Sequence, residues 1–149
     1  MTTTETHVAA DAVAHFATKL RFETDPSDVA AALEADPEAL VLVDSRNDFA
    51  WAQGHLPQAL HLPTGQIRDR ALELLSLDRP VVVYCWGPGC NGSTRAALEF
   101  ARLGYTVQEM IGGFEYWVRE GRPVENSGGL EQQPHDPLTG PPLGVACDC

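Results

Sequence analysis

One stretch of this sequence, residues 81–95, reads VVVYCWGPGCNGSTR, and the rest of the chain is organised around it. It begins with a short β-branched run that ends at Cys85, continues through a glycine- and proline-rich loop containing Cys90, and becomes helical near Ser93. The pattern predicts a buried strand that delivers a thiol to its carboxyl end, facing the N-terminus of the next helix. Free N–H groups and the helix dipole stabilise a thiolate or another anion at such a point. The stretch therefore predicts a cysteine-based active site.

The composition narrows the class of protein. A chain of 149 residues, 44% of them hydrophobic, fits one globular domain with a short appendage. The net charge of −11 argues against a nucleic acid or an anionic membrane as partner. No apolar run approaches the roughly 20 residues that cross a bilayer, and the first residues lack the basic region of a secretory signal. We therefore expect a cytoplasmic protein.

The four cysteines form two close pairs, Cys85 with Cys90 and Cys147 with Cys149. A secreted disulfide framework would spread its cysteines along the chain, so clustered thiols indicate a reducing compartment and catalytic, redox or metal chemistry. Cys147 and Cys149, with His135, are a weak candidate metal site because three ligands at loose spacing carry little information. We expect no cofactor.

Outside this stretch, short apolar runs alternate with helical patterns. Strands are predicted at 40–44, 81–84 and 105–110, and helices at 6–21, from 27, at 48–53, 64–77, 93–103 and 114–120. Alternation at this spacing predicts an α/β domain with a parallel central sheet flanked by helices.

Three regions follow from this pattern. We assign residues 1–38 to an N-terminal helical extension packed on the domain, 39–125 to the α/β domain, and 126–149 to a Pro/Gly-rich C-terminal tail. The apolar stripe of the first helix either covers the core or forms a homodimer. The tail has few large apolar residues to offset its ordering entropy, so we expect it to be flexible or draped over the domain.

Six short motifs follow one another between about residues 40 and 125. They are VLVDSR at 41–46, GHLP at 54–57, VVYC at 82–85, LGY at 103–105, GGF at 112–114 and GRPV at 121–124. The ordered set resembles the single-domain form of the rhodanese (thiosulfate sulfurtransferase) superfamily. The resemblance implies a three-layer sandwich that moves sulfane sulfur from a donor such as thiosulfate to a thiol or cyanide acceptor through a cysteine persulfide.

The chain departs from the family pattern at two places. Gln58 stands in a turn where the family usually has glycine. The active-site loop also does not match the usual Cys-x4-Arg segment. Counting back from Gly104 makes Cys85 the strand-end cysteine, with a loop a couple of residues longer than usual. Residues 90–95 instead supply a literal Cys-x4-Arg beginning at Cys90, but shorten the following helix by about a turn. We favour Cys85 as the sulfur carrier.

The resemblance and the loop composition suggest roles for the remaining candidates. Cys90 resolves an oxidised or persulfidated Cys85 as a disulfide, is itself the nucleophile, or is a passive small residue. Asp44 and His55 are interpreted as structural, and Arg46 either attracts an anion or pairs with Asp44. Candidate substrate-binding residues supply loop amides, hydroxyls or cations: Trp86, Gly87, Gly89, Asn91, Gly92, Ser93, Thr94, Arg95 and Arg46.

Two other functions stay open. The first is a thiol-disulfide or arsenate-reducing redox enzyme that uses Cys85 and Cys90. The second is a non-enzymatic rhodanese-like binding module. Inactive members of the superfamily typically lose the cysteine, and this loop has two, so the sequence favours an enzyme.

Overall fold

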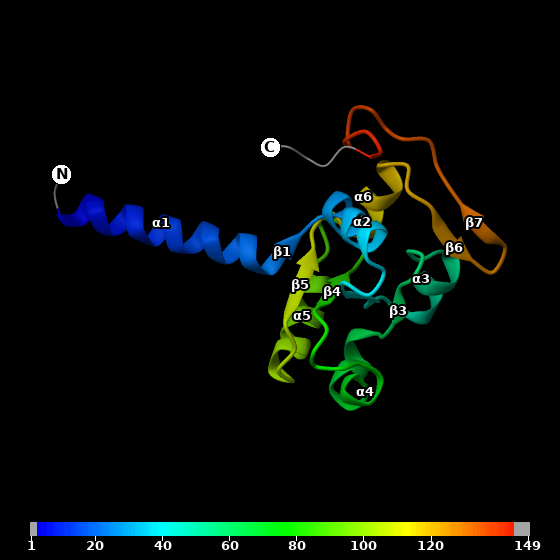
Figure 1. Ribbon diagram of the computed structural model, residues 1–149, viewed down its shortest axis with the longest axis horizontal. Coiled ribbons are helices and arrows are strands. Elements are labelled where there is room, and N and C mark those ends of the chain that lie inside the picture. The colour runs from blue at the N-terminus through cyan, green and yellow to red at the C-terminus, as the bar shows by residue number, and fades with distance from the viewer. Residues whose placement is uncertain (1–2, 145–149) are drawn as a thin grey trace.

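Residues 3–144 are described by the computed structural model, and side chains are described from residue 9 onward. Within this part of the chain a five-stranded sheet has the order β1-β5-β4-β2-β3, and every adjacent pair is parallel (Figure 1). The strands are β1 (Glu23–Thr24), β2 (Val41–Asp44), β3 (Leu60–His61), β4 (Val81–Tyr84) and β5 (Val107–Met110). The predicted α/β class with a central parallel sheet is confirmed.

Strand β4 lies at the centre of the sheet, and all four of its residues are buried. Its pairing with β2 places Asp44 opposite Tyr84. Ser45 and Cys85 therefore leave the sheet side by side at its carboxyl edge, where the Ser45 N–H donates to the Tyr84 carbonyl oxygen at 3.2 Å. Binding sites of open parallel sheets lie at this edge.

Helices cover both faces of the sheet and make the three-layer sandwich. They are α2 (Pro26–Ala35), α3 (Asp48–Gln53), α4 (Ile67–Leu74) after the short η1 (Thr64–Gln66), α5 (Gly92–Arg102) and α6 (Gly113–Arg119). Alternate residues of β4 serve the two cores. Val81 and Val83 belong to one core, with residues of α4 and α5, whereas Val82 and Tyr84 belong to the other, with residues of α2 and α6.

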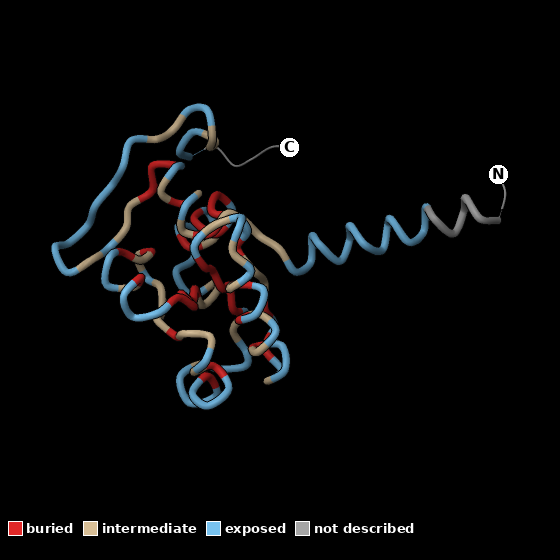
Figure 2. The backbone as a smooth tube through the Cα atoms, turned by 180° about the vertical axis from the view of Figure 1, so that it is seen from behind, coloured by how far each residue is buried: buried red, intermediate tan, exposed pale blue. Residues whose placement is uncertain are grey.

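We expected residues 1–38 to pack on the domain. The first helix, α1 (Thr3–Phe22), does not do so. It projects away from the sheet (Figures 1 and 2), and residues 9–22 are all exposed, including Val13 at 69% and Leu20 at 81%. Both faces of the sheet are already covered by other helices, so its apolar stripe meets no apolar surface there. Helix α2 does pack, and buries Val29 and Leu33. None of the helices in residues 3–144 is long and apolar enough to cross a membrane.

The C-terminal region contains a hairpin that the sequence patterns did not predict. Its antiparallel strands are β6 (Val124–Asn126) and β7 (Gly129–Glu131). The chain then returns over α6, where the Asp136 N–H donates to the Arg119 carbonyl oxygen at 2.8 Å. A ring nitrogen of His135, Nε2, contacts the Gly140 carbonyl oxygen at 2.8 Å. Cys147 and Cys149, the other two residues of the weak candidate metal site, lie outside the described residues.

The backbone conformation at Gln58 is one that favours glycine. Gln58 has φ of 67°, and among residues 3–144 it is the only non-glycine residue with a positive φ. Glycine adopts this conformation without steric cost, whereas a residue with a Cβ does not.

Candidate active site

Cys85 directly follows β4 and is 8% exposed. Its carbonyl oxygen accepts a hydrogen bond from the Phe114 N–H at 2.9 Å, and the Trp86 carbonyl accepts from the Glu115 N–H at 2.8 Å. These bonds tie the start of the loop to the N-terminus of α6. Gly113 makes the close approach possible, because a Cβ there would lie 2.7 Å from the Cys85 carbonyl oxygen and φ is +60°.

The two loop thiols lie in contact. The Sγ atoms of Cys85 and Cys90 are 3.1 Å apart, and both cysteines are free. The Gly92 N–H points at the Cys90 sulfur, with a nitrogen–sulfur distance of 3.4 Å. A Cβ on Gly92 would lie 2.5 Å from the Cys85 sulfur and 3.3 Å from the Cys90 sulfur. Gly92 is therefore the residue that leaves room for both thiols at the start of α5.

The contact shifts the pKa values of the two thiols in opposite directions. Burial, and then the hydrogen bond to Cys90, raise the pKa of the Cys85 thiol to about 11. The hydrogen bond from Cys85 lowers the pKa of Cys90, with further help from the backbone amides of Gly92 and Trp86. The resting pair thus holds its proton on Cys85 and its negative charge, once ionised, on Cys90. We had expected the thiolate on Cys85.

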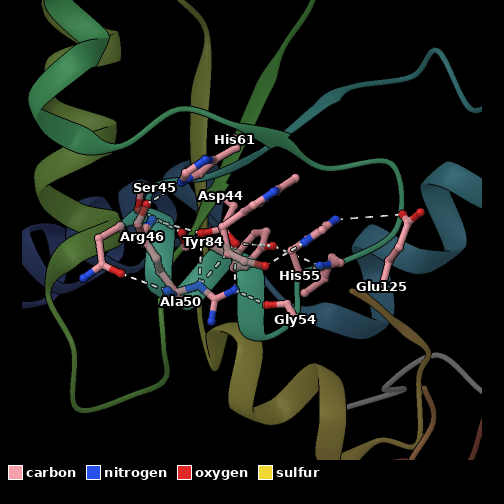
Figure 3. Close-up of polar contacts among 12 residues, drawn as sticks. Asp44, Ser45, Arg46, Ala50, Gly54, His55, His61, Tyr84 and Glu125 are labelled. Carbon is pink, nitrogen blue, oxygen red and sulfur yellow. Dashed lines mark hydrogen bonds and ion pairs between the residues drawn. The ribbon is translucent and has the colours of Figure 1, made fainter. Parts of the chain in front are cut away.

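A buried polar network joins the ends of β2 and β4 (Figure 3). The Arg46 guanidinium is 3% exposed and donates to Asp44 at 2.7 Å and to the Gly54 carbonyl at 2.7 Å. The Tyr84 hydroxyl donates to Asp44 Oδ2 at 2.8 Å and accepts from the Leu56 N–H at 3.0 Å. Burial and the Asp44 charge hold the pKa of Tyr84 well above its usual value. This network fixes the ends of β2 and β4.

The Arg46 guanidinium is thus engaged in this buried network and lines neither hollow beside the thiols. Its guanidinium carbon lies 4.4 Å from the ring centroid of Trp86 and 4.3 Å from that of Phe114. These rings separate it from the solvent and support the loop by cation–π contact. His55, which we interpreted as structural, stacks on Trp51 with ring centroids 3.4 Å apart. Its Nδ1 lies 2.9 Å from the Trp51 carbonyl oxygen.

The hydroxyls at the start of α5 have a protein partner. Ser93 and Thr94 donate to Glu109 Oε2 at 3.2 and 2.8 Å. We expected both hydroxyls to donate to a bound anion, and in the structure they donate to this carboxylate instead. Arg95 and Asn91 are exposed, and the Asn91 side chain makes no cap hydrogen bond with α5. Glu109 was not among the candidates, since no motif marks it.

Two hollows meet at Cys90. The less open one, which we call the thiol cavity, has a volume of about 540 Å³ and is lined by both cysteines and by loops around β1, β5 and α6. Of the predicted binding residues, Gly87, Ser93 and Thr94 line it. A second, more open hollow is lined by Trp86, Gly87, Gly89, Cys90 and residues of α6. Arg46, Asn91, Gly92 and Arg95 line neither.

The described residues offer no ready metal site. Within residues 3–144, no group of three or more His, Cys, Asp or Glu side chains is arranged to hold a metal ion. The reactive groups of the site are two adjacent thiols, Cys85 and Cys90, at the end of β4.

Comparison with known proteins identifies the class. Residues 25–120 match the Rhodanese-like domain family, and the chain belongs to that family. The match begins at residue 25, so it includes α2, which we had assigned to the N-terminal extension.

Particular relatives extend the match. The chain is 36% identical over 97 residues to the thiosulfate sulfurtransferase GlpE of Pseudomonas syringae, covering 64% of this chain and 87% of that protein. It is 40% identical over 91 residues to a sulfurtransferase of Allochromatium vinosum, covering 60% of this chain and 82% of that one. The crystal structure of the BH2092 protein from Bacillus halodurans superposes with a TM-score of 0.75 at 39% identity, covering 81% of this chain and 88% of that one.

Proposed function

We propose that this protein is a sulfurtransferase that carries sulfane sulfur as a persulfide on Cys85. The observation that carries the proposal is the thiol pair itself, with sulfurs 3.1 Å apart at the carboxyl end of β4 on the wall of a cavity. Relatives that are named sulfurtransferases support it, one of them a thiosulfate sulfurtransferase.

In the first half-reaction Cys90 acts as the proton acceptor. The Cys90 thiolate takes the proton of Cys85 across their 3.1 Å contact, and the Cys85 sulfur attacks the outer sulfur of the donor. With thiosulfate as donor, the sulfur–sulfur bond of thiosulfate breaks, sulfite leaves with the bonding electrons, and Cys85 becomes a persulfide. The Trp86 N–H is the hydrogen-bond donor that the backbone offers to the Cys85 sulfur.

Two features favour Cys85 over Cys90 as the carrier. Cys85 is fixed by the strand and by the bond from its carbonyl to Phe114, whereas Cys90 lies further along the loop and is half-buried. A persulfide on the enclosed thiol is also protected from solvent. The lowered pKa of Cys90 suits a base that is regenerated in each cycle.

The same distance favours one second candidate, a thiol-disulfide redox enzyme. Sulfurs at 3.1 Å need to approach by only about 1 Å to reach the disulfide bond length. In that reaction the Cys90 thiolate attacks the Cys85 sulfur of a mixed disulfide, the other sulfur of that disulfide leaves as a thiolate, and a Cys85–Cys90 disulfide forms.

Intact mass measurement distinguishes these functions. After incubation with thiosulfate and removal of excess donor, the wild-type protein should gain one sulfur, about 32 Da. Cys85→Ser should abolish the gain, and Cys90→Ser should retain it. Loss of the adduct in Cys90→Ser alone would assign the sulfur to Cys90. A loss of about 2 Da with residues 85 and 90 cross-linked would favour the redox enzyme.

A further inference from the structure

The thiol cavity is lined by carboxylates and by no cation among the described residues. Its acidic side chains are Glu23, Asp25, Glu109 and Glu120, and none of its described lining residues is Lys, Arg or His. A binding site for a dianion normally presents arginine or lysine. Neither the one lysine nor any of the nine arginines lines the thiol cavity. Arg119 lines the second hollow, which shares Cys90, and it pairs there with Glu115 at 3.0 Å.

Three of the four carboxylates are already engaged. Glu23 pairs with Lys19 at 3.1 Å, and Glu120 with Arg122 at 2.8 Å. Asp25 caps α2 by accepting from the Asp28 N–H at 3.0 Å.

Glu109 is different, because within residues 3–144 no basic side chain lies within ion-pair distance of its carboxylate. It is half-buried and held in place by the hydroxyls of Ser93 and Thr94, so its orientation is fixed and its charge is not neutralised. Ser93 follows Gly92, where a Cβ would lie 2.5 Å from the Cys85 sulfur and 3.3 Å from the Cys90 sulfur. The Glu109 carboxylate thus lies on the wall of the cavity that the two thiols also line.

The two arginines that the sequence suggested for substrate binding do not line this cavity. Arg46 is paired with Asp44 behind Trp86 and Phe114, and Arg95 is exposed outside the cavity. The net charge of the chain, −11, adds a long-range repulsion of anions.

We propose that the thiol cavity takes as sulfur acceptor a small thiol bearing an ammonium group, and that Glu109 binds this group and determines the specificity. The inference rests on the proposed sulfurtransferase function and concerns its second half-reaction. There the acceptor sulfur attacks the outer sulfur of the Cys85 persulfide, the bond between the two persulfide sulfurs breaks, and Cys85 regains a proton from the acceptor thiol. The products are the acceptor persulfide and the free enzyme, so no oxidant or reductant is needed.

The test is a single-turnover transfer from the loaded protein. The full chain is loaded with thiosulfate and desalted, then mixed with cysteamine, 2-mercaptoethanol or 3-mercaptopropionate, which carry a positive, no or a negative charge beside the thiol. Loss of the about 32 Da adduct, followed by intact mass, gives each transfer rate. The ratio of the cysteamine rate to the mercaptopropionate rate is then compared between variants, which cancels the intrinsic reactivity of each thiol.

Glu109→Gln should lower this ratio about four- to ninefold, because a partly exposed charge contact changes each of the two rates by about two- to threefold in opposite directions. Glu73→Gln is the matched control: it removes the same charge from the exposed face of α4 (Ile67–Leu74), outside the cavity. It should leave the ratio within about twofold of the wild type. Added salt should also lower the wild-type ratio, a measurement that does not depend on the folding of a variant.

An unchanged ratio in Glu109→Gln, or an equal fall in Glu73→Gln, would overturn the inference while leaving the sulfurtransferase proposal intact. Failure to form an adduct with thiosulfate or any other sulfane-sulfur donor would overturn the proposed function itself, and the inference with it.

Discussion

The contact between the two thiols gives a sharp prediction for Cys90→Ala. The hydrogen bond and the charge of Cys90 both raise the pKa of Cys85, and burial is the larger cause. Removing the Cys90 sulfur leaves the burial and deletes the other two effects. The pKa of Cys85 should therefore fall from about 11 toward its ordinary value of 9.0 without reaching it.

The magnitude follows from two opposing trends. At pH 8, a fall of about one to one and a half units in the pKa raises the thiolate fraction of Cys85 by about 10- to 30-fold. The nucleophilicity of a thiolate decreases as its pKa decreases, with a Brønsted coefficient of about 0.4–0.5, which offsets about 2.5- to sixfold of that gain. The alkylation rate of Cys85 at pH 8 should thus rise by about three- to eightfold.

The assay is alkylation with iodoacetamide as a function of pH, with the peptide containing residue 85 quantified by mass spectrometry. The midpoint of the pH profile reports the pKa, and the plateau at high pH reports access to the thiol, so greater exposure in the variant is measured separately. A midpoint that stays in place or rises in Cys90→Ala would refute the division of acidity between the two thiols.

Three further predictions concern stability. Asp44→Ala should lower the free energy of unfolding in urea by about 3–5 kcal/mol, because it leaves the buried Arg46 charge unpaired; a loss below about 1 kcal/mol would mean that the charge finds another partner. Gly113→Ala should lower the free energy of unfolding clearly more than Gly104→Ala. Both positions have a positive φ, which costs an alanine about 1–2 kcal/mol at each, but only the Cβ at 113 meets the Cys85 carbonyl. Equal losses of unfolding free energy would contradict the tight contact. Deleting residues 1–20 should change the unfolding free energy by less than about 1 kcal/mol, because residues 9–20 are exposed, and a large loss of thermal stability would show that α1 contributes to the core.

Much of the fold was predictable because buried strands and capped helices leave local signals. The bounds predicted for α3, residues 48–53, and for β4, residues 81–84, coincide with those of the structure. Strand β1 has two residues and therefore no periodicity to detect. The exposure of α1 was also out of reach, because an apolar stripe predicts a buried face but not the surface that covers it.

The site was predictable where neighbours in sequence are neighbours in space. The two thiols, the loop and the start of α5 all come from one segment, and the Asp44–Arg46 pair from two residues that are close in sequence. The contacts that define the electrostatics of the site join distant residues. Tyr84 reaches Asp44 across 40 positions, and Glu109 takes the hydroxyl of Ser93 across 16. No spacing rule connects such pairs before the topology is known.

The shortness of β1 has a mechanical consequence. Helix α1 has 20 residues and joins the sheet through β1, which has only two. Glu23 of β1 is paired in register with Glu109 on the cavity wall. The attachment includes the bond from the Ile111 N–H to the Thr24 carbonyl and the bond from the Gln108 amide to the Arg21 carbonyl. A movement of α1 is therefore transmitted through β1 to β5, the strand that carries Glu109.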